Sequence, residues 1–75
     1  MTATLIERIA EIVECEPSTI SPESEFRSLE NWDSLAYMSV VAMIDSEFSL
    51  VISQEDFRKL TTINDIAQFI QSKNQ

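Results

Sequence analysis

With 75 residues, the chain has room for one small domain around a single hydrophobic core. Thirteen acidic residues against five basic ones give a net charge of −8, which disfavours binding to nucleic acid or to an anionic membrane surface. The chain contains neither histidine nor glycine, which excludes Ser–His and Cys–His catalytic pairs and glycine-rich phosphate loops, so the composition argues against an enzyme.

The composition also predicts the cellular compartment of the protein. The single cysteine, Cys15, excludes an internal disulfide and is typical of a reducing compartment. No segment approaches the roughly 18 consecutive apolar residues of a membrane span, and the first residues lack the pattern of a signal peptide. We therefore expect a soluble cytoplasmic protein without membrane insertion, forming one domain over residues 1–75.

A first helix is predicted by apolar residues at spacings of three and four. Thr4 and Glu7 have the spacing of a capping box, and Thr2 is an alternative start. The helix is expected to end at Glu16–Pro17, because the residue before a proline is pushed away from helical angles. The apolar stripe consists of Leu5, Ile6, Ile9, Ile12 and Val13.

A long polar connection follows from Cys15 to Asp33 and contains both prolines, Pro17 and Pro22. Connections of this length without secondary structure are uncommon and often functional. Three spaced apolar residues are expected to anchor it on the core, namely Ile20, Phe26 and Leu29.

The second helix is predicted from about Ser34 to about Glu47, with Asp33 as its N-cap. We expect a broad buried face made of Leu35, Met38, Val41, Ala42, Ile44 and Phe48. The expected outer positions are mostly uncharged and are Ala36, Ser39, Val40, Met43 and Glu47.

Two further helices are predicted from capping pairs. Ser53 with Asp56 opens a short helix that ends near Leu60, and Thr62 with Asp65 opens the last helix. The apolar face of that last helix consists of Ile63, Ile66, Ala67 and Ile70. The apolar segment 50–52 has no partner strand elsewhere and is interpreted as a buried loop. The predicted fold is all-α, a four-helix bundle with three long helices and one short one.

Ser34 lies where the long connection, which is rich in acidic residues, ends and the second helix begins. The first N–H groups of a helix are unpaired and carry partial positive charge, so a phosphate on Ser34 would be stabilised there. Asp33 beside it is able to position a metal-bound donor substrate, or simply to cap the helix. Taken alone, an Asp-Ser pair that opens a helix is typical of ordinary capping.

The wider sequence resembles the acyl carrier protein family, the phosphopantetheine-binding domains of fatty acid, polyketide and related pathways. The matching features are Asp33-Ser34-Leu35, the helix ending Ile44–Phe48, the loop Leu50–Ile52, the stretch Phe57–Ile63, the last helix Asp65–Ile70, and the loop anchors Phe26 and Leu29. The resemblance implies an acyl-carrier-protein-like bundle with 4′-phosphopantetheine attached covalently to Ser34, and with Asp33 and Leu35 beside it as cofactor-binding residues.

By this resemblance the protein is a non-catalytic carrier of acyl or aminoacyl thioesters. The implied partners are a phosphopantetheinyl transferase, an acyl- or aminoacyl-loading ligase or transferase, and a downstream synthase or transferase. The resemblance also implies a monomer that binds these enzymes through the second helix and the preceding loop. Trp32 stands where many members have glycine, and the outer positions of the second helix carry few acids. These departures favour a dedicated carrier with an apolar docking face. The alternative is an unmodified helical adaptor.

A calcium loop is the main competing motif. Asp45, Glu47, Ser49 and Asp56 fall at positions one, three, five and twelve of such a loop. Position six, however, is Leu50 instead of the glycine that the sharp turn requires, and position twelve is not the usual glutamate. We therefore expect no metal site.

Several other side chains with reactive, charged or aromatic groups are expected to have only structural roles. Cys15 has no nearby base to activate it, so we expect a partly buried thiol. Arg58–Lys59 is interpreted as a solvated pair near a helix end. Trp32 and Tyr37 are expected to contribute to packing and not to contact a cofactor.

Overall fold

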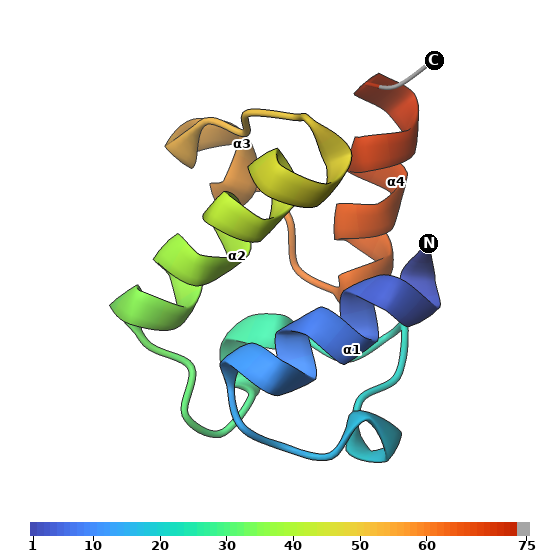
Figure 1. Ribbon diagram of the computed structural model, residues 1–75, viewed down its shortest axis with the longest axis vertical. Helices are drawn as coiled ribbons and strands as arrows, with labels where there is room; N and C mark the ends of the chain where they lie inside the picture. Colours follow the sequence, from blue (N-terminus) through green and yellow to red (C-terminus); the bar gives the residue numbers. More distant parts are fainter. Residues whose placement is uncertain (74–75) are drawn as a thin grey trace.

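Four helices form the fold of the protein, as a computed structural model that describes residues 1–73 shows (Figure 1). No strand occurs in that range, and the predicted all-α bundle with three long helices and one short helix is confirmed. The helices are α1 (Thr2–Ile12), α2 (Ser34–Phe48), α3 (Gln54–Arg58) and α4 (Ile63–Lys73), with 3₁₀ turns η1 (Pro17–Thr19) and η2 (Phe26–Ser28) in the long connection.

The core lies where α1 contacts both α2 and α4, with the long connection passing beneath α1 in Figure 1. Within the described range every buried side chain is apolar. Ile20 and Phe26 are buried and Leu29 is partly buried against the core, so all three predicted loop anchors are confirmed. The core cluster is Leu5, Ile9, Ala10, Ile20, Phe26, Val40, Ile44, Ile52, Phe57, Leu60, Ile63, Ile66, Ala67 and Ile70.

The ends of α1 differ from the prediction. The helix starts at Thr2, the alternative start, without a side-chain cap, so the expected capping box of Thr4 and Glu7 does not form. It ends before Glu16–Pro17 because Glu14 adopts a left-handed conformation with φ of 57°. The N–H of Cys15 then donates to the carbonyl of Ala10 at 2.9 Å, which closes the helix. In helix ends of this kind the left-handed residue, here Glu14, is usually glycine.

The predicted faces of α2 are wrong in part. Leu35 and Met38 were expected in the core but are 70% and 61% exposed, whereas Ala36 and Val40 were expected outside and are 4% and 0% exposed. Among the other positions, Ala42 is exposed, Val41, Met43, Ser39 and Phe48 are partly buried, Ile44 is buried and Glu47 is exposed. The helix is apolar on nearly every side, so its periodicity does not single out one face. The helices packed against it select the buried side.

The loop before α3 is also only partly buried. Ile52 is buried and Leu50 is partly buried, as predicted, but Val51 is 78% exposed. Val51 therefore faces solvent between two residues that pack against the core.

The capping pairs of the last two helices are confirmed. Asp56 donates its N–H to Ser53 Oγ at 3.1 Å, and Asp65 donates its N–H to Thr62 Oγ1 at 3.1 Å. In return, Asp65 Oδ2 accepts the N–H groups of Thr61 and Thr62, both at 3.0 Å. This reciprocal capping box satisfies donors at the start of α4 that have no partner within the helix.

The charged form of Asp65 is stabilised by the same contacts. The N–H groups of Thr62 and Thr61 lower the pKa of the carboxyl below its ordinary value of 3.8. Because the pKa is lower in the folded state, the contribution to stability is complete above the ordinary value and is lost as the pH falls through the folded value. We expect wild type to melt above Asp65→Asn at pH 7, with the gap closing in thermal melts below about pH 4. An equal gap at pH 7 and pH 2.5 would contradict this, and Asp45→Asn is the control.

Candidate functional site

The start of α2 is set by Asp33. Its Oδ1 accepts the N–H of Ala36 at 2.8 Å and its carbonyl accepts the N–H of Tyr37 at 3.0 Å, so the predicted N-cap is confirmed. Ser34 is the first helical residue and is exposed. Its hydroxyl therefore stands at the positive end of α2, in an exposed residue.

The loop that leads to Ser34 is held on both sides. Asn31 has a φ of 72°, and its Nδ2 donates to the carbonyl of Val13 at 3.2 Å, which ties the loop to the end of α1. The Trp32 ring packs edge-on against Phe26, with centroids 5.3 Å apart. Asparagine tolerates the left-handed region better than most residues, so the turn is made without glycine. These contacts fix the residues directly before Ser34.

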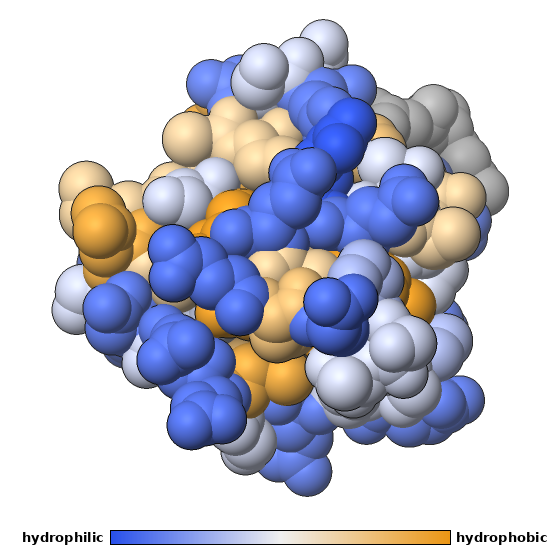
Figure 2. Space-filling model, turned by 60° about the horizontal axis from the view of Figure 1, so that its bottom comes forward, coloured by the Kyte–Doolittle hydropathy of each residue, from blue (hydrophilic) through white to orange (hydrophobic). Residues whose placement is uncertain are grey.

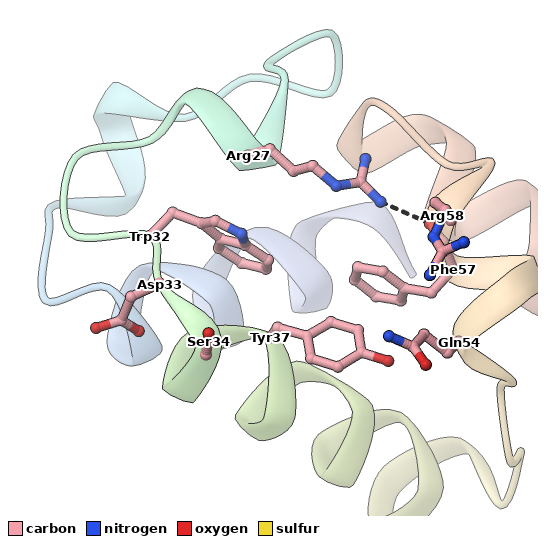
Figure 3. Close-up of a pocket in the computed structure, with 8 residues that line it drawn as sticks. All are labelled: Arg27, Trp32, Asp33, Ser34, Tyr37, Gln54, Phe57 and Arg58. Atoms are coloured by element: carbon pink, nitrogen blue, oxygen red, sulfur yellow. Dashed lines mark hydrogen bonds between the residues drawn. The ribbon is translucent and has the colours of Figure 1, made fainter.

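An open groove of about 400 Å³ adjoins Ser34 (Figure 3). Its apolar wall consists of Trp32, Tyr37 and Phe57, and the rings of Tyr37 and Phe57 meet edge-on at 5.0 Å. The predicted packing role of Trp32 and Tyr37 is therefore confirmed, but both side chains also line this groove. The complete lining is Arg27, Trp32, Asp33, Ser34, Tyr37, Gln54, Phe57 and Arg58.

Arg27 fixes the wall of the groove opposite α2. Its Nη2 donates to the carbonyl of Phe57 at 2.8 Å and its Nη1 donates to the carbonyl of Leu60. Arg27 therefore supplies hydrogen-bond donors to carbonyl groups at the end of α3 and just after it. Its guanidinium also lies over the rings of Phe26 and Phe57, at 4.7 and 5.5 Å from their centroids. No local sequence pattern identifies this role, because Arg27 and its partners lie 30 and 33 residues apart.

The predicted site residues do not all share the groove. Asp33 and Ser34 line it, whereas Leu35 lines a separate depression between α1 and α2, together with Ile12 and Ser39. Sequence reasoning missed Arg27, Gln54 and Phe57 as lining residues, and it treated Arg58 only as a solvated residue.

The face of the molecule shown in Figure 2 is largely hydrophilic and has separate apolar patches. Glu47, a member of the calcium-loop pattern, accepts Arg8 Nε with both carboxylate oxygens at 2.9 Å. In residues 1–73, no three metal-ligating side chains form a cluster. None of the helices in this range has the length and apolarity needed to cross a bilayer.

Comparisons with known proteins identify relatives over most of the chain. A family profile described as "Phosphopantetheine attachment site" matches residues 3–70. The acyl carrier protein of Thermosynechococcus vestitus is 31% identical over 87% of this chain and 80% of its own length. The acyl carrier protein of an Exiguobacterium species is 33% identical over 89% of this chain and 85% of its own. The meromycolate extension acyl carrier protein of Mycolicibacterium aurum is 32% identical over 92% of this chain and 71% of its own.

Proposed function

Because the chain belongs to the acyl carrier protein family, whose members carry covalently attached 4′-phosphopantetheine, we propose that Ser34 is the attachment residue and that the arm presents acyl or aminoacyl groups to biosynthetic enzymes. The observation that supports this proposal is the exposed hydroxyl of Ser34 at the start of α2, at the edge of an open groove. In this proposal the chain is not an enzyme.

The residues around Ser34 fit the group. The helix start favours the negative phosphodiester, and the groove offers an aromatic wall beside it. On attachment, a bond forms between Ser34 Oγ and the phosphorus of the coenzyme A phosphopantetheine, the bond from that phosphorus to the adenosine bisphosphate breaks, and the hydroxyl proton leaves to solvent. The thiol of the arm supplies the thioester chemistry. The carboxylate of Asp33 already caps α2, so its role here is to hold the helix start in position.

Intact-mass spectrometry tests the attachment. We expect incubation with coenzyme A and a broad-specificity phosphopantetheinyl transferase to add one phosphopantetheine, and peptide mapping to place it on Ser34. A chain that stays unmodified, or that is modified at another serine, would contradict the proposal. In the first case the alternative of an unmodified helical adaptor would gain support.

Partner enzymes are proposed to dock beside Ser34 through the exposed apolar side chains of α2, Leu35 and Met38. In the proposal these partners are the phosphopantetheinyl transferase, a loading ligase or transferase, and a downstream synthase or transferase. The first turn of α2 has no acidic residue, and apolar side chains of the helix are open to solvent at 70% and 61%. Apolar contacts are screened little by salt, so docking should depend only weakly on ionic strength.

Met38→Glu is expected to slow modification by the transferase about tenfold, because a carboxylate would be buried against an apolar partner surface at a cost of about 1.4 kcal/mol or more. Initial rates at sub-saturating carrier measure the effect. Val51→Glu is the matched control, since Val51 is also an exposed apolar residue, at 78% against 61% for Met38, but follows α2 at its other end. Equal rates for the two variants would rule out docking at Met38.

A further inference from the structure

The groove beside Ser34 concentrates positive charge in an otherwise acidic protein. The whole chain has five basic residues, and two of them, Arg27 and Arg58, line this groove. The one acidic residue that lines it is Asp33, and one oxygen of its carboxylate already accepts the N–H of Ala36. The charge around the groove therefore favours an anion, although the protein as a whole repels anions.

The two guanidinium groups are not equivalent. Both terminal nitrogens of Arg27 donate to main-chain carbonyls, and its guanidinium lies over aromatic rings, so it contributes charge from a fixed position. Arg58 is exposed, and none of the ion pairs within residues 1–73 involves it. Figure 3 shows Arg58 and Gln54 on α3, across the groove from Ser34 on α2.

We propose that Arg58, with Gln54 beside it, binds an anionic group that is carried on the arm attached to Ser34. The inference rests on the proposed function, because the arm delivers the anion to the groove. A guanidinium binds planar or tetrahedral oxyanions through paired, charge-assisted hydrogen bonds. Two sources have this chemistry, namely the phosphodiester of the arm and a carboxylate on an acyl cargo.

The experiment loads the protein with three coenzyme A compounds through the transferase: free coenzyme A, butyryl-coenzyme A and succinyl-coenzyme A. The two thioesters carry four-carbon acyl groups and differ in a terminal carboxylate. The variants are Arg58→Ala and its matched control Lys59→Ala, which removes the same charge from the neighbouring residue that does not line the groove. Trp32 lines the groove and is the only tryptophan, so its fluorescence reports directly on occupation. Thermal melts provide the second measurement.

The expected result is a stabilisation by loading that Arg58→Ala reduces and Lys59→Ala does not. An exposed ion pair in a domain of this size corresponds to about 1–5 °C in the melting midpoint, and the effect should fall as salt is raised. A loss that is equal for all three compounds assigns the phosphodiester as the bound anion. A loss confined to the succinyl form, together with a change in Trp32 emission for that form, assigns the cargo carboxylate.

Two results would overturn the inference, and they are distinguishable. A mass gain at Ser34 with the same loading effect in wild type, Arg58→Ala and Lys59→Ala would overturn only the role of Arg58. The absence of any mass gain at Ser34 would overturn the proposed function, and the inference with it.

Discussion

Replacing Ser34 by alanine is expected to abolish the mass gain from coenzyme A and transferase completely, because the residues that line the groove include no other serine and no threonine. Alanine is a good helix former, and Ser34 is exposed, so the stability of the fold should change by no more than about 0.5 kcal/mol. Intact mass measures the first effect, and a thermal melt measures the second.

The control for this result is Ser39→Ala, which removes a partly buried hydroxyl from the same helix. That variant should be modified to completion. Full modification of the Ser34 variant would refute the assignment of the attachment residue. A Ser34 variant that is unmodified because it has unfolded would be recognised from its melt.

Phe26→Ala is expected to destabilise the protein by about 3–5 kcal/mol, the usual cost of removing a fully buried phenylalanine side chain. Phe26 is 0% exposed, its ring meets the rings of Trp32 and Phe57 at 5.3 Å, and Arg27 lies over it. A domain of this size has a total stability of only about 4–11 kcal/mol. The melting midpoint should therefore fall by more than about 10 °C.

Phe69→Ala provides the comparison, since Phe69 is only partly buried and packs at the edge of the core. Its loss should be clearly smaller in urea or thermal denaturation. If both variants lost the same stability, Phe26 would not be the anchor that holds the long connection against α3. The same experiment reports on the groove, because Phe26 supports both Trp32 and Arg27.

Features that depend on a few adjacent residues could be predicted from the sequence. The capping pairs Ser53 with Asp56 and Thr62 with Asp65 form as expected, because each joins a side chain to an N–H group three residues away. The helix start at Asp33 and the exposure of Ser34 follow from the same local chemistry. The loop anchors were predictable because burying a large apolar side chain is favourable, and these three are large aliphatic or aromatic residues spaced through a polar segment.

Features that depend on distant residues could not be predicted in this way. The side of α2 that is buried was predicted wrongly at Leu35 and Val40, because a helix that is apolar all round gains about the same from burying any of its faces, and only its contacts with α1 and the rest of the core choose one. The end of α1 was also placed too late, because the left-handed residue there is Glu14 and not glycine.

The sequence alone therefore determined the helical class, the helix starts with their own caps, and a serine at the positive end of the second helix. Only the tertiary structure decided what surrounds that serine. Arg27 comes from the long connection and Arg58 from α3, and they line one groove because the ring of Phe57 and the carbonyl groups at the end of α3 hold the connection there. Contacts across 30 residues depend on how the whole core packs, and no local spacing encodes them.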